Sequence, residues 1–330
     1  MDEVVILSKS EVQACLPMSK AIDAVRTAYT AFAQGRVQMP PVQHLDVEDY
    51  RGEVDIKSGF VEDFGLIGTK IASGFYDNQK LGLPPGVAVI VLMDLKTSMP
   101  LAIMDGTHIT AYRTGAAGAV AASVLARRDS TSVGILGAGT QGRMQLIALK
   151  ELFGIKRVSV WDIEKDRALD YQSDIQHKLG IDVAVANTPA DVVPEADILV
   201  TATPSRKPLI MTDSIHSGLH INAIGADGPG KQELDPLIMK RVSKIVVDSL
   251  VQCSRIGELQ HAFAQGLVDD TRVHAEIGEI LMGAKPGREN ANEITLFDST
   301  GLSAQDIAAA NVVLETAKDK GLGKRVDLLG

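Results

Sequence analysis

The chain has 330 residues, of which 45% are hydrophobic and 23% charged, a composition typical of a globular protein with enough apolar side chains for two cores. The formal net charge of −9 at pH 7 argues against a nucleic acid or an anionic membrane surface as a partner. We expect neither a membrane span nor a signal peptide, and the two cysteines, Cys15 and Cys253, lie far apart, so we expect a reduced cytoplasmic protein.

The first third of the chain predicts an α+β domain. A helix is expected over residues 19–34, because its apolar side chains share one face and Gly35 ends it. Strand-like runs follow at residues 53–61, 66–74, 86–93 and 100–104. The last two runs flank a short polar connection, which is typical of an antiparallel hairpin. Strands that precede an alternating pattern indicate a separate domain.

A helix rich in glycine and alanine is expected over about residues 109–127, and close packing must stabilise it because its helix propensity is low. Strands and helices then alternate. Strands are expected at 132–136, 156–161, 183–185, 197–201, 220–224 and 244–247, and helices at 143–152, 255–265 and 304–318. The pattern predicts an α/β fold with a Rossmann-type doubly wound parallel sheet. We expect this domain to span residues 121–304, and residues 1–120 to form the other domain together with a returning helix at about 305–330.

The strand at 132–136 runs directly into Gly137-Ala138-Gly139-Thr140-Gln141-Gly142 and then into a helix. In such a Gly-x-Gly-x-x-Gly motif the first glycine permits a tight turn, the second lets the backbone approach a diphosphate, and the third lets helix and strand pack closely. The free N–H groups at the start of the helix point at the anion. The motif therefore predicts a dinucleotide site.

Asp162 follows the next strand, twenty residues after the last glycine of the motif. An acid at this position bonds the adenosine ribose hydroxyls and repels a 2′-phosphate, so NAD is favoured. The nearby Lys165 leaves NADP possible.

Three cationic residues interrupt apolar or small-residue patterns in the first domain, namely Lys57, Lys70 and Arg113. Lys70 has small neighbours on its own face, Gly68 and Ala72, which would leave room for a ligand. Arg113 can hold a carboxylate through two parallel hydrogen bonds, which lysine cannot do. Lys57 fits a substrate contact and a lysine that extends from a sheet edge into water equally well.

Two loops at the expected carboxyl edge of the second sheet carry short polar residues. Asp227 follows the strand at 220–224, where it can contact a ligand or cap a turn. Ser299 lies in Leu296-Phe297-Asp298-Ser299-Thr300-Gly301, where capping of the next helix is the alternative. The seven histidines show no metal-binding spacing, so no metal is expected.

In the segments described above and in several others, the sequence resembles the ornithine cyclodeaminase/mu-crystallin family, and within it most closely the archaeal-type alanine dehydrogenases. The matching segments are Met39–Pro41, Pro100–Asp105, Arg113–Ala117, Gly137–Gln141, Thr203–Pro208, His220–Leu234 and Glu293–Asp306. The resemblance implies an NAD(P)-binding domain joined to a substrate-binding and dimerisation domain, in a homodimer. It also implies hydride chemistry at an amino or imino carbon.

The resemblance also assigns expected roles. Lys70 and Asp227 match catalytic residues, Lys70 as the acid/base and Asp227 beside the reacting nitrogen. Arg113 and Lys57 are the expected substrate contacts, with Arg113 on the carboxylate and also near the cofactor. The expected cofactor contacts are Arg113, Thr114, Gly137, Gly139, Thr140, Gln141, Gly142, Asp162, Lys231 and Ser299.

One segment departs from the alanine dehydrogenase pattern. Asp55-Ile56-Lys57-Ser58-Gly59-Phe60 resembles relatives that act in ectoine breakdown and iminosuccinate reduction, so the substrate side chain stays open. The expected activity is an oxidoreductase that interconverts a small α-amino acid and its imino or keto acid. One alternative is an ornithine-type cyclodeaminase that recycles its NAD internally, which Gln232 disfavours because those enzymes usually carry threonine there. The other is a non-catalytic binding protein, which the presence of Lys70 and Asp227 disfavours.

Overall fold

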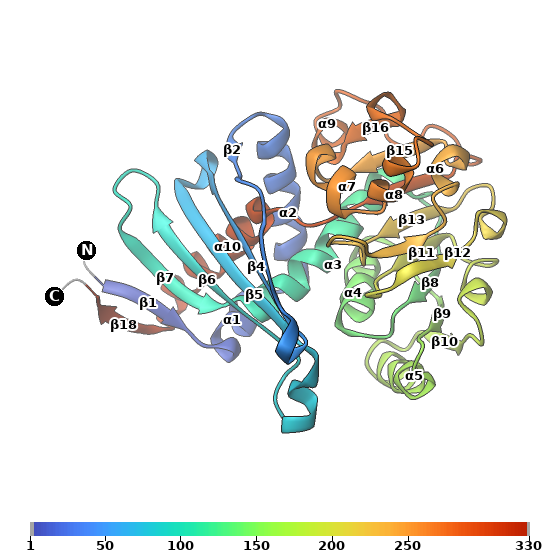
Figure 1. The fold of residues 1–330 in the computed structure, drawn as a ribbon. Helices are drawn as coiled ribbons and strands as arrows, with labels where there is room; N and C mark the ends of the chain where they lie inside the picture. Colours follow the sequence, from blue (N-terminus) through green and yellow to red (C-terminus); the bar gives the residue numbers. More distant parts are fainter. Residues whose placement is uncertain (1–2, 329–330) are drawn as a thin grey trace. The chain divides into compact units, whose positions relative to one another are not determined.

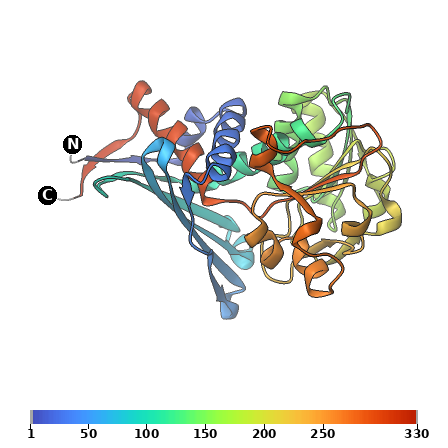
Figure 2. The same ribbon diagram turned by 90° about the horizontal axis from the view of Figure 1, so that it is seen from above.

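The structure is a computed structural model that describes residues 3–328, and the chain folds into two compact units (Figures 1 and 2). The first unit contains the described residues up to Arg113 together with those from Leu302 onward, and the second unit is Thr114–Gly301. The sequence predicted domain boundaries between residues 120 and 121 and between residues 304 and 305. The difference arises because the helix Gly106–Leu125, labelled α3, joins the second unit from Thr114 onward: a Cβ at Gly115 would lie 2.5 Å from the backbone oxygen of Met144.

The first unit is built on an eight-stranded mixed sheet. Its strands are β1 (Glu3–Leu7), β2 (Val37–Gln38), β3 (Gln43–Val47), β4 (Gly52–Val61), β5 (Leu66–Phe75), β6 (Gly86–Asp94), β7 (Pro100–Asp105) and β18 (Lys324–Asp327). They lie in the order β18-β1-β7-β6-β5-β4-β2, and β3 also pairs with β4. β1 and β7 are parallel, and the other pairs are antiparallel. The predicted hairpin of β6 and β7 is confirmed.

Three further helices belong to this unit: α1 (Lys9–Cys15), α2 (Met18–Ala33) and α10 (Ser303–Lys320). The helices α2 and α10 pack against each other, and α10 also contacts β4, β5 and β6 (Figures 1 and 2). The apolar side chains that predicted α2, such as Val25 and Ala28, are fully buried. α10 ends at Gly321, whose φ of +64° suits glycine.

The second unit contains an eight-stranded sheet in which every pair is parallel. Its strands are β8 (Ser132–Leu136), β9 (Arg157–Trp161), β10 (Asp182–Val185), β11 (Ile198–Thr201), β13 (His220–Ala223), β15 (Lys244–Val247), β16 (Val273–Glu276) and β17 (Thr295–Asp298). The order is β10-β9-β8-β11-β13-β17-β15-β16. The order reverses direction at β8, so the predicted doubly wound sheet is confirmed. β12 (Arg206–Ile210) and β14 (Gln232–Leu234) form a separate parallel pair.

The helices of the second unit are α4 (Thr140–Leu152), α5 (Lys165–Leu179), α6 (Ile238–Arg241), α7 (Leu250–Ile256), α8 (Leu259–Ala264) and α9 (Ile277–Leu281). α4 begins three residues earlier than predicted, with Gly139 as its N-cap. The single helix predicted over 255–265 is wrong. The chain forms α7 and α8 instead, because the Asp298 carboxylate accepts hydrogen bonds from the N–H groups of Glu258 and Leu259 and starts a new helix there.

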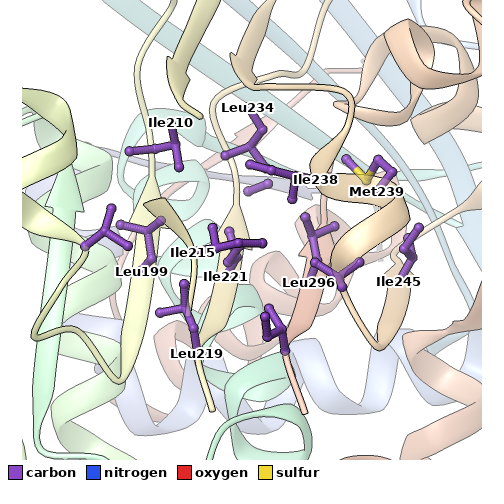
Figure 3. Close-up of a cluster of buried hydrophobic side chains, with 14 of the residues drawn as sticks. Leu199, Ile210, Ile215, Leu219, Ile221, Leu234, Ile238, Met239, Ile245 and Leu296 are labelled. Atoms are coloured by element: carbon purple, nitrogen blue, oxygen red, sulfur yellow. The ribbon is translucent and has the colours of Figure 1, made fainter. Parts of the chain in front are cut away.

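A buried apolar cluster stabilises the second unit (Figure 3). It joins side chains of the parallel strands, Leu199, Ile221, Ile245 and Leu296, to those of the loops and short elements that follow, Ile210, Ile215, Leu234, Ile238 and Met239. These strands are buried on both faces, which explains why they read as continuous apolar runs in the sequence. The core thus fixes the carboxyl ends of the strands, where the polar loops begin.

Candidate active site

A pair of lysines lies at the centre of the first unit. Lys57 of β4 and Lys70 of β5 are direct partners in the antiparallel register, so their side chains share one face of the sheet. Lys57 is 8% exposed and Lys70 is 3% exposed. Two like charges opposite each other are unfavourable unless an anion lies between or beside them.

Two glycines bring a helix to the same face. Gly59 and Gly68 are also register partners, one pleat from the lysine pair. A Cβ at Gly68 would lie 2.4 Å from Cγ1 of Ile307, and one at Gly59 would lie 2.7 Å from Oγ of Ser303. Their missing side chains therefore let the first turn of α10 rest directly on β4 and β5.

Asp306, in that first turn, supplies the anion. Lys70 Nζ donates a hydrogen bond to Asp306 Oδ1 at 2.9 Å and lies 2.8 Å from Oδ2. Arg113 donates from Nε to the same Oδ1 at 2.9 Å, and from Nη1 to Gln305 Oε1 at 3.3 Å. Arg113 is 6% exposed and Asp306 is 2% exposed, so the whole cluster is withdrawn from water.

The surroundings lower the pKa values of both Lys70 and Asp306. Burial lowers the pKa of Lys70 to about 7, with help from the charges of Arg113 and Lys57 and against the attraction of Asp306. Burial also opposes ionisation of Asp306, but the positive charges of Arg113, Lys70 and Lys57 outweigh it and hold the pKa of that carboxyl below its usual range. An amine with a pKa near neutrality can take up and release protons, which suits an acid/base group.

The glycine loop of the second unit has the geometry of an anion cradle. Gly137 has a φ of +99°, and a Cβ at Gly142 would lie 2.1 Å from the Gly137 carbonyl oxygen. A Cβ at Gly139 would meet nothing within 4 Å, so no protein group explains that glycine, and the space beside it suits a ligand. Thr140 begins α4, whose first N–H groups are free to bind an anion.

Asp162 lies beside this loop at the end of β9. Its Oδ2 accepts a hydrogen bond from the Ala138 N–H at 2.8 Å, and its Oδ1 accepts one from Glu164 at 3.0 Å. Asp162 also lines a cavity of about 270 Å³ together with Gly137, Gly139, Trp161, Ile163, Arg167, Ala202, Thr203, Pro204, Ser205 and Leu209. The cavity adjoins the glycine loop, as a site for an adenosine group should.

The other predicted cofactor residues have separate surroundings in the same unit. The Thr114 carbonyl accepts a hydrogen bond from Gln145 Nε2 at 2.7 Å. Gln141 follows Thr140 in α4 and is partly exposed. Lys231 donates to Asp227 Oδ1 at 2.7 Å, so these two predicted residues form an ion pair. Ser299 is buried and donates from Oγ to Asp248 Oδ2 at 2.8 Å.

The structure thus brings Lys57, Lys70 and Arg113 together in one unit, and the glycine loop and Asp162 together in the other. Asp227 belongs to the second unit, as do Lys231 and Ser299. The sequence analysis missed Asp306 and Gln305. A signal was present, because a buried lysine and a buried arginine require a carboxylate, and Asp306 lies in the first turn of the last long helix.

The sequence analysis also missed a set of buried acids in the second unit. These are Glu233 of β14, Asp248 after β15, Glu258 between α7 and α8, and Asp298 at the end of β17. Burial raises the pKa of Glu233 to about 7 and that of Asp298 to about 8. Each accepts backbone N–H groups, as when Glu258 accepts those of Glu233 and Leu234, so the set fixes the loops that carry the predicted site.

Within residues 3–328, no group of three or more His, Cys, Asp or Glu side chains is arranged to hold a metal ion. In the same residues, no helix has the length and apolar content needed to cross a membrane.

The model of the ornithine cyclodeaminase/mu-crystallin family matches residues 2–321. An archaeal alanine dehydrogenase dimer with bound NAD is 42% identical, covers 99% of this chain and 100% of its own, and superposes with a TM-score of 0.93. The Δ1-pyrroline-2-carboxylate reductase of Thermococcus litoralis, in complex with NADH and L-proline, is 36% identical with a TM-score of 0.94, covering 98% and 100%. The iminosuccinate reductase of Paracoccus denitrificans, in complex with NAD⁺, is 31% identical with a TM-score of 0.92, covering 99% and 100%.

Proposed function

The chain belongs to the ornithine cyclodeaminase/mu-crystallin family, and we propose that it is an NAD-dependent dehydrogenase or imine reductase that interconverts a small α-amino acid and its α-imino or α-keto acid. One observation carries the proposal, namely the buried cluster in which Lys70 and Arg113 share Asp306. Such a cluster offers a carboxylate anchor beside a proton donor, which the reduction of an imine requires.

In this proposal Arg113 anchors the substrate carboxylate. A guanidinium has five N–H donors, of which Asp306 and Gln305 use two. The donors left on the two terminal nitrogens are enough to hold both oxygens of a carboxylate. Lys70 is the acid/base, because its pKa of about 7 lets it exchange a proton with the reacting nitrogen at neutral pH.

The second unit fits a dinucleotide. The open space beside Gly139 and the cavity next to Asp162 support a diphosphate at the glycine loop and an adenosine beyond it. When bound, a nicotinamide cofactor would supply or accept the hydride. Asp227, Lys231 and Ser299 follow or adjoin the carboxyl ends of β13 and β17, the edge where a doubly wound sheet binds its ligands, and we assign them to the nicotinamide end and the reacting nitrogen.

We assign to Lys57 a role in selecting the substrate side chain. It lies opposite Lys70 on the same face of the sheet and is buried, so its positive charge would favour a substrate with a second acidic group. The similarity to an iminosuccinate reductase supports this candidate, and the similarity to alanine dehydrogenase supports a monocarboxylate. The test therefore includes both monocarboxylate and dicarboxylate substrates.

The test follows NADH absorbance with pyruvate or oxaloacetate plus ammonia or methylamine, and with Δ1-pyrroline-2-carboxylate. We expect net NADH oxidation with at least one substrate. Lys70→Met should lower turnover by about 10²–10⁴-fold and leave NADH binding intact, because it removes an acid/base group only. Lys96→Met, at an exposed lysine of the same unit, is the matched control and should retain full activity.

Three outcomes would count against the proposal. A cyclodeaminase would convert ornithine without net change in NADH, and a binding protein would hold a ligand without turnover. Loss of NADH binding in Lys70→Met would make Lys70 a cofactor or folding residue.

We also propose a homodimer that forms through the sheet face opposite α10. Apolar side chains on this face stay exposed in the single chain, including Leu45 (54%), Ile71 (45%), Val87 (50%) and Val89 (45%). Ile71 and Val89 are register partners, so the face is continuous. A second copy is the expected occupant, because a related alanine dehydrogenase is a dimer. Sedimentation velocity would show a monomer if the assignment is wrong.

A further inference from the structure

Asp306 has an unusual position among the charged groups of the first unit. Among the described residues of that unit, it is the one buried carboxylate, and three buried cations surround it. Its Oδ1 accepts from both Lys70 Nζ and Arg113 Nε at 2.9 Å. A single oxygen therefore fixes the separation between the amine and the guanidinium.

The surroundings hold Asp306 itself in place. It lies in the first turn of α10, where the helix N-terminus favours a negative charge. The glycine pair of β4 and β5 admits this turn to the sheet and leaves little room for it to shift. The carboxylate is thus attached to a rigid element and not to a loop.

Gln305 braces the other side of Arg113. Its Nε2 donates to the Tyr29 hydroxyl at 2.8 Å, and its Oε1 accepts from the Leu302 N–H at 2.8 Å as well as from Arg113 Nη1. With Nε on Asp306 and Nη1 on Gln305, the plane of the guanidinium is set, and so is the direction of its remaining donors.

We propose that Asp306 is a positioning residue, which aligns Lys70 and Arg113 for one substrate and keeps Lys70 able to carry a proton. The inference rests on the acid/base and anchoring roles proposed above. Asp306 does not touch the reacting atoms. It acts by holding the amine at a fixed distance from the carboxylate anchor, and by supplying the negative charge that opposes repulsion among Lys57, Lys70 and Arg113.

Two variants separate charge from position. Asp306→Asn removes the charge that favours the ammonium form, so the limb of the pH–rate profile that reports Lys70 should move to lower pH, and kcat/KM for substrate should fall by about 10²-fold. Asp306→Glu keeps the charge but moves it by one methylene. It should leave the pH limb in place and raise KM for the substrate carboxylate, while the Kd for NADH stays unchanged.

The matched control is Asp319→Asn, at an exposed aspartate of the same helix, which should behave as the parent protein. A readout without turnover uses protein carrying 13C at lysine Cε. The Lys70 resonance, assigned by its absence in Lys70→Met, should titrate at lower pH in Asp306→Asn than in the parent. This measurement keeps its meaning even if no tested substrate is turned over, and the failure of the proposed function is then distinct from the failure of this inference.

The inference is wrong if the Lys70 resonance titrates alike in Asp306→Asn and in the parent. It is also wrong if Asp306→Glu, which stays testable if Asp306→Asn does not fold, keeps the parent values of kcat and KM. An equal rise in KM for substrate and in Kd for NADH would indicate a general structural role and would also overturn it.

Discussion

We expect Asp162 to have two roles, one toward the cofactor and one in the glycine loop, that a substitution cannot separate fully. Its position after β9 suits a ribose contact, and its Oδ2 also holds the Ala138 N–H of the glycine loop. Asp162→Arg should therefore raise the ratio of kcat/KM for NADP to that for NAD, because repulsion of a 2′-phosphate becomes attraction. The affinity for both cofactors should also fall, because the loop loses its hydrogen bond.

The steady-state constants for both cofactors check this prediction. Asp182→Arg is the matched control, since Asp182 is an exposed aspartate at the opposite end of the neighbouring strand β10. It should leave the cofactor ratio unchanged. Equal kcat/KM for NAD and NADP in the parent protein would contradict the role assigned to Asp162.

The contact of α10 with β4 and β5 sets the geometry of the buried cluster of Lys70, Arg113 and Asp306. Gly68→Ala places a Cβ 2.4 Å from Cγ1 of Ile307, so the Ile307 side chain must shift, and we expect α10 to move away from β5 with it. We expect a loss of about 1–3 kcal/mol in the free energy of unfolding from overpacking, and a loss of turnover because Asp306 moves with the helix. Denaturant unfolding and the NADH assay measure the two effects.

Gly74→Ala is the matched control for this prediction. Gly74 lies on the same strand, but a Cβ there would meet only the Glu53 side chain, at 3.6 Å. Stability and turnover should both stay close to the parent values. Full activity in Gly68→Ala would show that the close approach of α10 is not needed by the cluster.

The elements also show where sequence reasoning succeeds and where it ends. The hairpin of β6 and β7 and the parallel strands of the second unit were predictable, because their signals are local periodicity and turn residues. The pairing of β1 with β18 was not, because it joins opposite ends of the chain. The break between α7 and α8 was missed because the carboxylate that causes it, Asp298, is contributed by a distant strand.

The candidate site likewise contains residues that the sequence predicted and residues that it did not. The glycine loop, Lys70 and Arg113 were predicted from their residue types and neighbours in sequence. Asp306 was missed because it is 236 residues from Lys70, and the glycine pair that brings the two together acts only after the sheet has formed. The buried acids of the second unit were missed for a similar reason: the N–H groups that stabilise Glu258 belong to residues of another element.

Buried titratable groups of the two units change the stability of the protein with pH in opposite directions. In the second unit, burial raises the pKa of Glu233 to about 7 and that of Asp298 to about 8. The folded state then binds these protons more tightly than the unfolded state does. Their contribution to stability is complete below the unfolded pKa near 4 and is lost as the pH rises through 7 and 8.

Lys70 changes the stability with pH in the direction opposite to that of the two acids. Burial lowers its pKa from 10.5 to about 7, so between these values the unfolded state binds more protons, and stability rises with pH. The loss from Glu233 is nearly complete at pH 7 and that from Asp298 at pH 8, whereas the gain from Lys70 continues through pH 9. Lys70→Met removes this gain, so its Tm relative to that of the parent should be lower at pH 9 than at pH 7. Calorimetric Tm values of both proteins between pH 7 and pH 9 test this prediction. Lys96→Met should follow the parent. Parallel Tm curves for Lys70→Met and the parent would mean that Lys70 keeps an ordinary pKa in the folded protein, which would also weaken its assignment as the acid/base.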